Sequence, residues 1–458
     1  MANSSGRQSG GLKSKLNAFH QKMGDFWWYS LLLFCACRFA DVLNAFVGLW
    51  LVPKYVPPSE LGAVMPLMQF ANFLAIPIAA FSNTFRNELT QLSIKKEFGK
   101  LKTLMRGVFI ASAVFIFIAT LIAHFALPAF LERIRIAEGS LGLIIIATSF
   151  VSAISPIYSN ALQALKKFKA QSLISIIGAP IRLITMLITM PFRALSGYFI
   201  GQASVPVFSM AASVIALKKE LSVKAEPYWD KETVKKFTFT LLTFLTWGTI
   251  SGFYSLVEST IIRQRLPDLD SAGYYIATRF SDIAGFLAAT LSFTLFPFAA
   301  EKSASREDPR PLIIKSIIAN GCFCILLAVP FSIIGQQIFS ILPHADKYIE
   351  YFWVVPWLIA IVWISSIYGF YSMSEVAGGR FGFLKWAMPL ELIYSTLLLI
   401  ISGHGYFSKY IPTSWTYFLT NHNIYSLKTM LYWMMSLNVI KGIFCIVSML
   451  NADHRTRL

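Results

Sequence analysis

Residues 26–52 form an apolar segment that is long enough to cross a bilayer yet carries two charged side chains near its middle. A membrane-spanning helix needs about 20 apolar residues, and an ionisable side chain at its centre costs about 2.5–3.5 kcal/mol on insertion scales. Arg38 and Asp41 are three residues apart and share one helix face, which Asn44 and Gly48 continue. This polar stripe predicts that the helix faces the polar interior of a bundle and not lipid.

The composition extends this prediction to the whole chain. Of the 458 residues, 56% are hydrophobic and only 14% are charged, with a mean hydropathy of +0.60, whereas soluble domains carry about 25% charged residues. Apolar runs of near bilayer length recur, so we expect an all-α polytopic membrane protein. The twelve expected spans are 26–52, 62–84, 106–130, 141–163, 171–191, 196–217, 238–262, 272–299, 313–335, 350–373, 384–402 and 429–450.

Two short sequence matches divide these spans into two related sets of six. Residues 155–158 (SPIY) resemble 365–368 (SSIY) at an offset of 210, and residues 60–62 (ELG) resemble 271–273 (SAG) at an offset of 211. An even number of spans per set gives halves of parallel topology, related by a pseudo-two-fold axis along the membrane normal. The predicted organisation is a cytoplasmic basic tail (1–25), a six-helix bundle (26–217), a cytoplasmic linker (218–237), a second six-helix bundle (238–450) and a cytoplasmic tail (451–458).

The distribution of basic residues gives the predicted orientation. With both termini placed in the cytoplasm, the inner segments hold 27 Lys and Arg, the outer loops hold 9, and 4 lie inside spans. Membrane proteins concentrate Lys and Arg in cytoplasmic loops, so both termini are expected inside. The same bias accounts for the net charge of +17 without nucleic acid as a partner.

Polar residues inside spans gather in the helices that the two-fold relates. Arg279 and Asp282 repeat the Arg-x-x-Asp step of the first span. Arginine binds phosphate oxygens in pairs and keeps its charge when partly desolvated, so this pattern predicts a cationic lumen for an anionic substrate. The alternative is that each Arg-x-x-Asp pair only holds helices together. The candidate substrate-binding residues are Arg38, Arg182 and Arg279, the coupling or charge-pairing candidates are Asp41, Glu258 and Asp282, and the candidate polar lining is Asn44, Gln69, Asn72 and Ser255.

Two further charges lie inside expected spans. Glu391 falls in 384–402, and Lys441 in 429–450 either extends toward the inner surface or forms a buried pair. The five cysteines all fall in apolar segments, and the two C-x-C pairs point their side chains about 200° apart around a helix. We therefore expect neither a metal site nor a disulfide framework.

Five short motifs occur near the ends of expected spans: Leu51-Val52-Pro53, Glu60-Leu61-Gly62, Ala272-Gly273-Tyr274-Tyr275, Leu295-Phe296-Pro297 with Glu301, and Gly379-Arg380-Phe381. With the twelve-span, two-fold pattern, they resemble the multidrug/oligosaccharidyl-lipid/polysaccharide exporter superfamily, in its O-antigen and polysaccharide flippase branch. The resemblance implies a V-shaped, multi-pass transporter of the bacterial cytoplasmic (inner) membrane. It would move an undecaprenyl-diphosphate-linked oligosaccharide, an O-antigen or exopolysaccharide repeat unit, to the periplasmic leaflet by alternating access.

The same resemblance implies partners and site roles. The partners are a polyprenyl-diphosphate-linked glycan, membrane lipids and polysaccharide polymerase or assembly proteins. Arg38, Arg182 and Arg279 would attract the diphosphate sugar in a cationic lumen.

Two other functions remain as alternatives. A multidrug or cation antiporter of the same fold needs an acidic, aromatic pocket, whereas the predicted interior has at least as many arginines as acids. A membrane polysaccharide polymerase or ligase usually needs a sizeable loop with catalytic side chains, and the longest outer loop, 403–428, holds no carboxylate. No nucleotide-binding loop of the type G-x-x-x-x-G-K-[ST] is present. We expect a secondary transporter without enzymatic activity or catalytic residues, with H⁺ or Na⁺ as the coupling ion.

Overall fold

In a computed structural model, the residues that the structure describes are 39–40, 42–136, 140–305, 307–401 and 426–451. Over these ranges the chain is all helical and contains no strand. Within the described residues, ten helices are long and apolar enough to cross a membrane, and the shorter apolar helix Val42–Tyr55 and α16 (Leu384–Ile401) overlap the two other expected spans, 26–52 and 384–402. The prediction of an all-α polytopic fold is confirmed.

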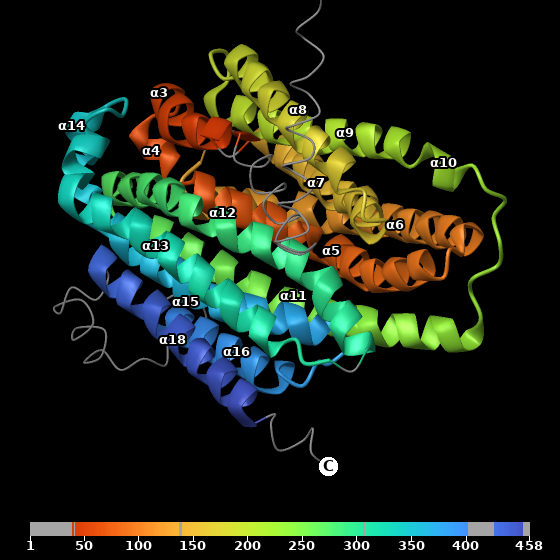
Figure 1. The fold of residues 1–458 in the computed structure, drawn as a ribbon. Helices are drawn as coiled ribbons and strands as arrows, with labels where there is room; N and C mark the ends of the chain where they lie inside the picture. The colour runs from red at the N-terminus through yellow and green to blue at the C-terminus, as the bar shows by residue number, and fades with distance from the viewer. Residues whose placement is uncertain (1–38, 41, 137–139, 306, 402–425, 452–458) are drawn as a thin grey trace, which may run out of the picture.

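The helices lie side by side in two bundles, red to yellow-green and green to blue in Figure 1. The N-terminal bundle contains η1 (Val47–Leu51), α3 (Val52–Tyr55), α4 (Pro58–Leu61), α5 (Val64–Ile94), α6 (Phe98–Arg133), α7 (Ser140–Ala164), α8 (Phe168–Thr189) and α9 (Ala194–Ala216). After α10 (Lys218–Leu221), the C-terminal bundle contains α11 (Lys231–Arg265), α12 (Asp268–Ala304), α13 (Arg310–Phe339), α14 (Ala345–Tyr348), η2 (Ile349–Tyr351), α15 (Val354–Ala377), α16 and α18 (Leu427–Asn451). The predicted N-terminal tail and the C-terminal tail beyond residue 451 lie outside the described residues.

Several helices extend beyond the spans expected from hydropathy. Helix α11 begins at Lys231 and not at residue 238, and α5 continues to Ile94 and not only to residue 84. Hydropathy detects only the part of a helix that lies in hydrocarbon, whereas the backbone hydrogen bonds continue where the side chains reach water. Helix α11 begins in the polar linker because the Asp230 side chain accepts a hydrogen bond from the Thr233 amide at 2.7 Å, which caps the helix.

The two-fold relation predicted from the repeats is visible in the packing. Helix α5 packs along α7 in the N-terminal bundle, and α12 packs along α15 in the C-terminal bundle. The repeat-related segments 60–62 and 271–273 also meet, because a Cβ on Gly62 would lie only 2.2 Å from Oγ of Ser271. Small residues that the repeat aligns therefore let the two bundles touch where α12 begins.

Helix α11 joins the bundles at their centre. It packs along α5 of the N-terminal bundle and along α16 of its own. Gly248 and Gly252, one turn apart, approach the same α5 residue: a Cβ on Gly252 would lie 2.5 Å from Cδ1 of Ile76. Small residues at a spacing of four let membrane helices approach closely, so this contact depends on the absence of side chains on α11.

The linker that begins with α10 is attached to the N-terminal bundle. Nζ of Lys167 pairs with Glu220 at 2.7 Å, and the Tyr228 hydroxyl donates to Glu88 at 2.8 Å. Burial and the neighbouring Glu88 carboxylate raise the pKa of Tyr228. Figure 1 shows the segment running down the right side of the molecule from α10 to α11.

Candidate functional site

Loops that the sequence places on one side of the membrane lie together in the structure. Arg135 contacts Asp268 and Arg263 contacts Ser59 at one end, which we call the outer end. The 166–169 turn contacts the end of α12 at the other, which we call the inner end. The names follow the predicted orientation, which stays a prediction.

The predicted polar face of the first helix contacts two of the predicted cationic residues. Oδ1 of Asn44 accepts a hydrogen bond from Nη1 of Arg182 in α8 at 2.7 Å. One turn further, Gly48 packs against Arg279, since a Cβ there would lie 3.0 Å from Cδ of that arginine. One face of one helix thus contacts two arginines, one from each bundle. Arg38 and Asp41, which share that predicted face, lie outside the described residues.

Arg279 lies between the two bundles and pairs along its own helix. Its Nη1 is 3.0 Å from Oδ2 of Asp282, one turn along α12. Its Nη2 lies 3.0 Å from Sδ of Met65 in α5, and the guanidinium is 5.0 Å from the centre of the Tyr275 ring. The Arg279 side chain is 18% exposed and that of Asp282 is 41% exposed. Arg279 thus pairs along α12 and also contacts the N-terminal bundle through Met65 and Gly48, and a role for it in a cationic lumen stays a prediction.

A second ion pair lies inside the C-terminal bundle and decides between the two alternatives for Lys441. Nζ of Lys441 in α18 pairs with Oε1 of Glu391 in α16. The other carboxylate oxygen accepts a hydrogen bond from Oγ of Ser251 in α11 at 2.5 Å. The Lys441 and Glu391 side chains are 9% and 2% exposed. Lys441 therefore forms a buried pair and does not extend toward the inner surface.

The remaining predicted residues lie on α5 and α11. Ser255 donates to a backbone carbonyl of its own helix at 3.1 Å. Glu258 is half-buried and interacts electrostatically with Lys441. Gln69 is half-buried and Asn72 is exposed. Their roles stay predictions. Within the described ranges, no group of three or more His, Cys, Asp or Glu side chains could hold a metal ion.

The outer end holds a buried arginine whose position just after the expected span 238–262 predicts only a loop charge. Arg263, at the end of α11, is 1% exposed. It donates to the backbone carbonyls of Ser59 at 2.5 Å and Ile134 at 3.2 Å, both in the N-terminal bundle, and to Oδ1 of Asp268 at 2.8 Å. Arg135 of the N-terminal bundle reaches the same oxygen at 2.9 Å. Two arginines and one aspartate thus hold the outer ends of the bundles together.

The inner end is joined by contacts of another kind. The guanidinium of Arg86 in α5 lies 3.9 Å from the centre of the Phe296 ring in α12, and its Nη2 is 3.6 Å from Sδ of Met373 in α15. Lys166 and Glu301 form an ion pair across the bundles at 3.9 Å, with side chains 59% and 66% exposed. A pocket of about 500 Å³ opens beside this pair, lined from both bundles.

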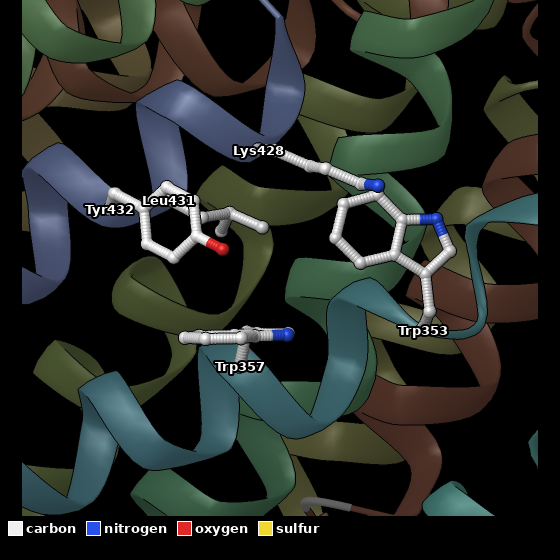
Figure 2. Close-up of a pocket in the computed structure, with 5 residues that line it drawn as sticks. All are labelled: Trp353, Trp357, Lys428, Leu431 and Tyr432. Carbon is white, nitrogen blue, oxygen red and sulfur yellow. The ribbon is translucent and has the colours of Figure 1, made fainter.

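A separate aromatic pocket of about 360 Å³ lies at the outer ends of α15 and α18. Figure 2 shows the Tyr432 hydroxyl and the Trp357 ring beside this pocket. Lys428 lies next to the Trp353 ring. The Trp357 and Tyr432 rings meet edge to face with their centres 5.4 Å apart, and Nζ of Lys428 is 5.5 Å from the centre of the Trp353 ring. Trp and Tyr gather at membrane–water interfaces, so the pocket fits the level of the predicted outer surface.

Comparison with solved structures identifies the fold. A structure of MATE in the straight conformation matches with a TM-score of 0.68 at 12% identity, over 96% of this chain and 99% of that chain. A MOP superfamily transporter from Pyrococcus furiosus gives a TM-score of 0.67 at 11% identity, over 93% and 96%. A mutant of the Vibrio cholerae MATE transporter VcmN gives 0.64 at 13%, over 96% and 98%. The chain has the MATE fold.

MATE transporters belong to the MOP superfamily, which is the multidrug/oligosaccharidyl-lipid/polysaccharide exporter superfamily that the sequence motifs resemble. The predicted architecture of twelve helices in two bundles is therefore confirmed. No protein-family model and no curated protein matches the chain. At 11–13% identity, the likeness establishes the fold and leaves the cargo open.

Proposed function

We propose that the protein is a flippase of the bacterial inner membrane that moves an undecaprenyl-diphosphate-linked oligosaccharide to the periplasmic leaflet by alternating access. The observation that carries the proposal is that two acids inside the C-terminal bundle have basic partners. Asp282 pairs with Arg279, and Glu391 pairs with Lys441. Acids that already have basic partners are poor sites for a cationic cargo, and Arg182 adds a further positive charge, so these charges fit an anionic cargo better than a cationic one.

The two arginines suit a diphosphate by position as well as by charge. Arg182 and Arg279 contact the first helix one turn apart, at Asn44 and Gly48, and a guanidinium binds two phosphate oxygens at once. A diphosphate would compete with Asp282 for Arg279. Because Arg279 also contacts the N-terminal bundle, binding of the cargo would change the interface between the bundles. The sugar would cross between the bundles while the polyprenyl tail stays in lipid.

Coupling to an H⁺ or Na⁺ gradient through Asp41, Glu258 or Asp282 is part of this proposal, as are polysaccharide polymerase or assembly proteins as partners. A multidrug or cation antiporter is the second candidate. One similar structure is described as a multidrug resistance MATE family transporter, and the 41% exposed side chain of Asp282 is an acid that a cation could reach. A cationic cargo would, however, have to displace Arg279 from that acid.

Reconstitution into liposomes tests the proposal. Movement of a polyprenyl-diphosphate-linked oligosaccharide to the outer leaflet is followed with a glycan-cleaving enzyme added outside, and ethidium transport is followed in parallel under H⁺ and Na⁺ gradients. We expect protein-dependent movement of the glycan lipid and no ethidium transport. Ethidium transport without glycan movement would favour the antiporter, and lengthening of the glycan by the purified protein would favour a polymerase or ligase.

A matched pair of variants ties the activity to the site. Arg182→Gln keeps a donor for Asn44 but removes the positive charge, so we expect it to lose most of the glycan movement. Arg193→Gln makes the same change at an exposed position where α9 begins and should leave the activity unchanged. Equal activity in both variants would contradict a role for Arg182 in binding the diphosphate.

A further inference from the structure

The Glu391–Lys441 pair is enclosed on all sides that the structure describes. Both carboxylate oxygens of Glu391 have donors, one from the Lys441 ammonium and the other from the Ser251 hydroxyl. The ammonium also lies 4.9 Å from the centre of the Tyr368 ring in α15. Four helices of the C-terminal bundle, α11, α15, α16 and α18, therefore surround one positive charge.

An ion pair is an expensive way to join membrane helices. Each charged group at the centre of a span costs about 2.5–3.5 kcal/mol on insertion scales, whereas a hydrogen bond between membrane helices contributes about 0.6 kcal/mol on average. Replacement of a buried pair by apolar residues of similar size is often neutral or stabilising. Helix joining alone therefore does not require Glu391 and Lys441, and the charges themselves point to a function.

A second acid lies on the helix face that contacts this pair. Glu258 is two turns along α11 from Ser251, a spacing that puts both side chains on one face, and the Lys441 charge acts on Glu258. The remaining interior acid of the bundle, Asp282, has its own partner in Arg279. Without the Lys441 ammonium, the Glu391 carboxylate and the Ser251 hydroxyl would remain together, with the Glu258 carboxylate on the same face of α11. Carboxylate and other oxygen ligands are those that hard cations bind.

We propose that Lys441 is a built-in counter-cation of the C-terminal bundle. Its ammonium occupies the place beside Glu391 that a free monovalent cation or a cationic cargo would otherwise take, so this one side chain determines which cargo charge the bundle accepts. The consequence for cargo rests on the proposed function, whereas the cation site itself does not. Asp41 and Asp282 then remain as positions for the predicted coupling ion.

The test compares cation responses of the purified full-length protein in detergent. The unfolding midpoint is measured while NaCl replaces choline chloride at a constant total of about 100 mM. In Lys441→Met, which removes the ammonium at similar length, we expect a saturable Na⁺-dependent rise of about 2 °C or more above the response of the unchanged protein. The double variant Lys441→Met/Glu391→Leu should lose that rise, because the principal carboxylate ligand is gone.

Two further variants keep the result interpretable. Lys441→Gln retains a donor to Glu391 and removes only the charge. The Na⁺ response is measured on Lys441→Gln if Lys441→Met does not fold. Lys428→Met makes the same substitution at an exposed position where α18 begins and should respond to Na⁺ like the unchanged protein. Identical Na⁺ responses in the unchanged protein, Lys441→Met and Lys441→Gln would overturn the inference.

Transport distinguishes failure of the inference from failure of the proposed function. If the flippase function and the counter-cation role of Lys441 are both correct, Lys441→Met in liposomes should gain ethidium transport or ethidium binding. Its glycan movement should fall at least about tenfold. A Na⁺ response in Lys441→Met with no glycan movement by the unchanged protein would support the counter-cation and contradict the flippase. Glycan movement by the unchanged protein with no new cation response in the variant would support the flippase and contradict the counter-cation.

Discussion

The two ends of the interface between the bundles are closed by different chemistry. At the outer end the guanidinium of Arg263 is buried and makes four hydrogen bonds, to Ser59, Ile134, Asp268 and Ser271. At the inner end Arg86 lies over an aromatic ring, and the ion pair of Lys166 and Glu301 is long and exposed.

The energies of these contacts differ in the same direction. Hydrogen bonds to charged groups contribute about 1.5–3 kcal/mol each, a cation–π contact about 0.5–2 kcal/mol and an exposed ion pair about 0–1 kcal/mol. Parting the outer ends therefore costs more than parting the inner ends. The inner end should open first, which fits a cargo that enters from the cytoplasmic side.

The largest expected effect comes from removing the centre of the outer contact. Arg263→Ala leaves the backbone carbonyls of Ser59 and Ile134 without this donor and leaves Asp268 with Arg135 alone, and each hydrogen bond to a charged group contributes about 1.5–3 kcal/mol. Allowing for water that enters the gap, we expect the outer-closed state to lose about a hundredfold in population relative to the outer-open state. Spin labels at positions 132 and 269, in a protein whose five cysteines are replaced, measure that population by double electron–electron resonance.

The control for Arg263→Ala is Arg133→Ala, at an exposed position of the same end. It should leave the distance distribution between the two labels unchanged. If Arg263→Ala also leaves that distribution unchanged, the outer contact does not hold the bundles together, and the ranking of the two ends is wrong.

A smaller effect is expected from Asp268, which both arginines share. Asp268→Asn keeps an oxygen acceptor for Arg263 and Arg135 and removes the negative charge, so two hydrogen bonds between charged partners keep only their charged donors and weaken. The loss of about 1.4 kcal/mol corresponds to about a tenfold shift toward the outer-open state. The same label pair measures it, with Asp346→Asn at an exposed outer position as the control. A shift as large as that of Arg263→Ala would mean that the charge of Asp268, and not the backbone acceptors, holds Arg263.

Contacts along one helix could be predicted from the sequence. The spacing of three between Arg279 and Asp282 predicts a shared face, and the structure pairs them. The spacing of four between Asn44 and Gly48 likewise predicts the face that contacts the two arginines. Helix periodicity fixes such relations before any tertiary contact forms.

Contacts between distant segments could not be predicted in this way. Glu391 and Lys441 are 50 positions apart, and nothing in their spacing selects them as partners among the interior charges. The position of Arg263 just after an apolar span predicts a residue of an outer loop. The side chain is buried only because segments of both bundles cover it. Its one signal in the sequence was Asp268 five residues later, since a nearby acid offers a partner for an arginine at a span end.

The third prediction concerns the inner end. Arg86→Leu removes the cation–π contact with Phe296 and keeps apolar contact with the ring, so we expect a loss of about 1 kcal/mol. That corresponds to about a fivefold shift toward the inner-open state, read from labels at positions 169 and 308. Arg106→Leu, at an exposed inner position of α6, is the matched control. A shift equal to that of Arg263→Ala would remove the difference between the ends on which the inferred order of opening depends.

The smallest effect is expected from the exposed pair at the inner end. Lys166→Gln removes one charge of an ion pair that is 3.9 Å long and has both side chains more than half exposed, and such pairs contribute about 0–1 kcal/mol. We expect less than about a twofold change in the inner-label distribution. Raising the salt concentration should abolish even that change, because the Debye length falls from about 10 Å at 0.1 M to about 3 Å at 1 M. Lys95→Gln, at an exposed inner position just after α5, should leave that distribution unchanged at either salt concentration. A larger, salt-insensitive effect of Lys166→Gln alone would mean that Lys166 acts in the inner pocket beside it, through a contact other than the surface pair with Glu301.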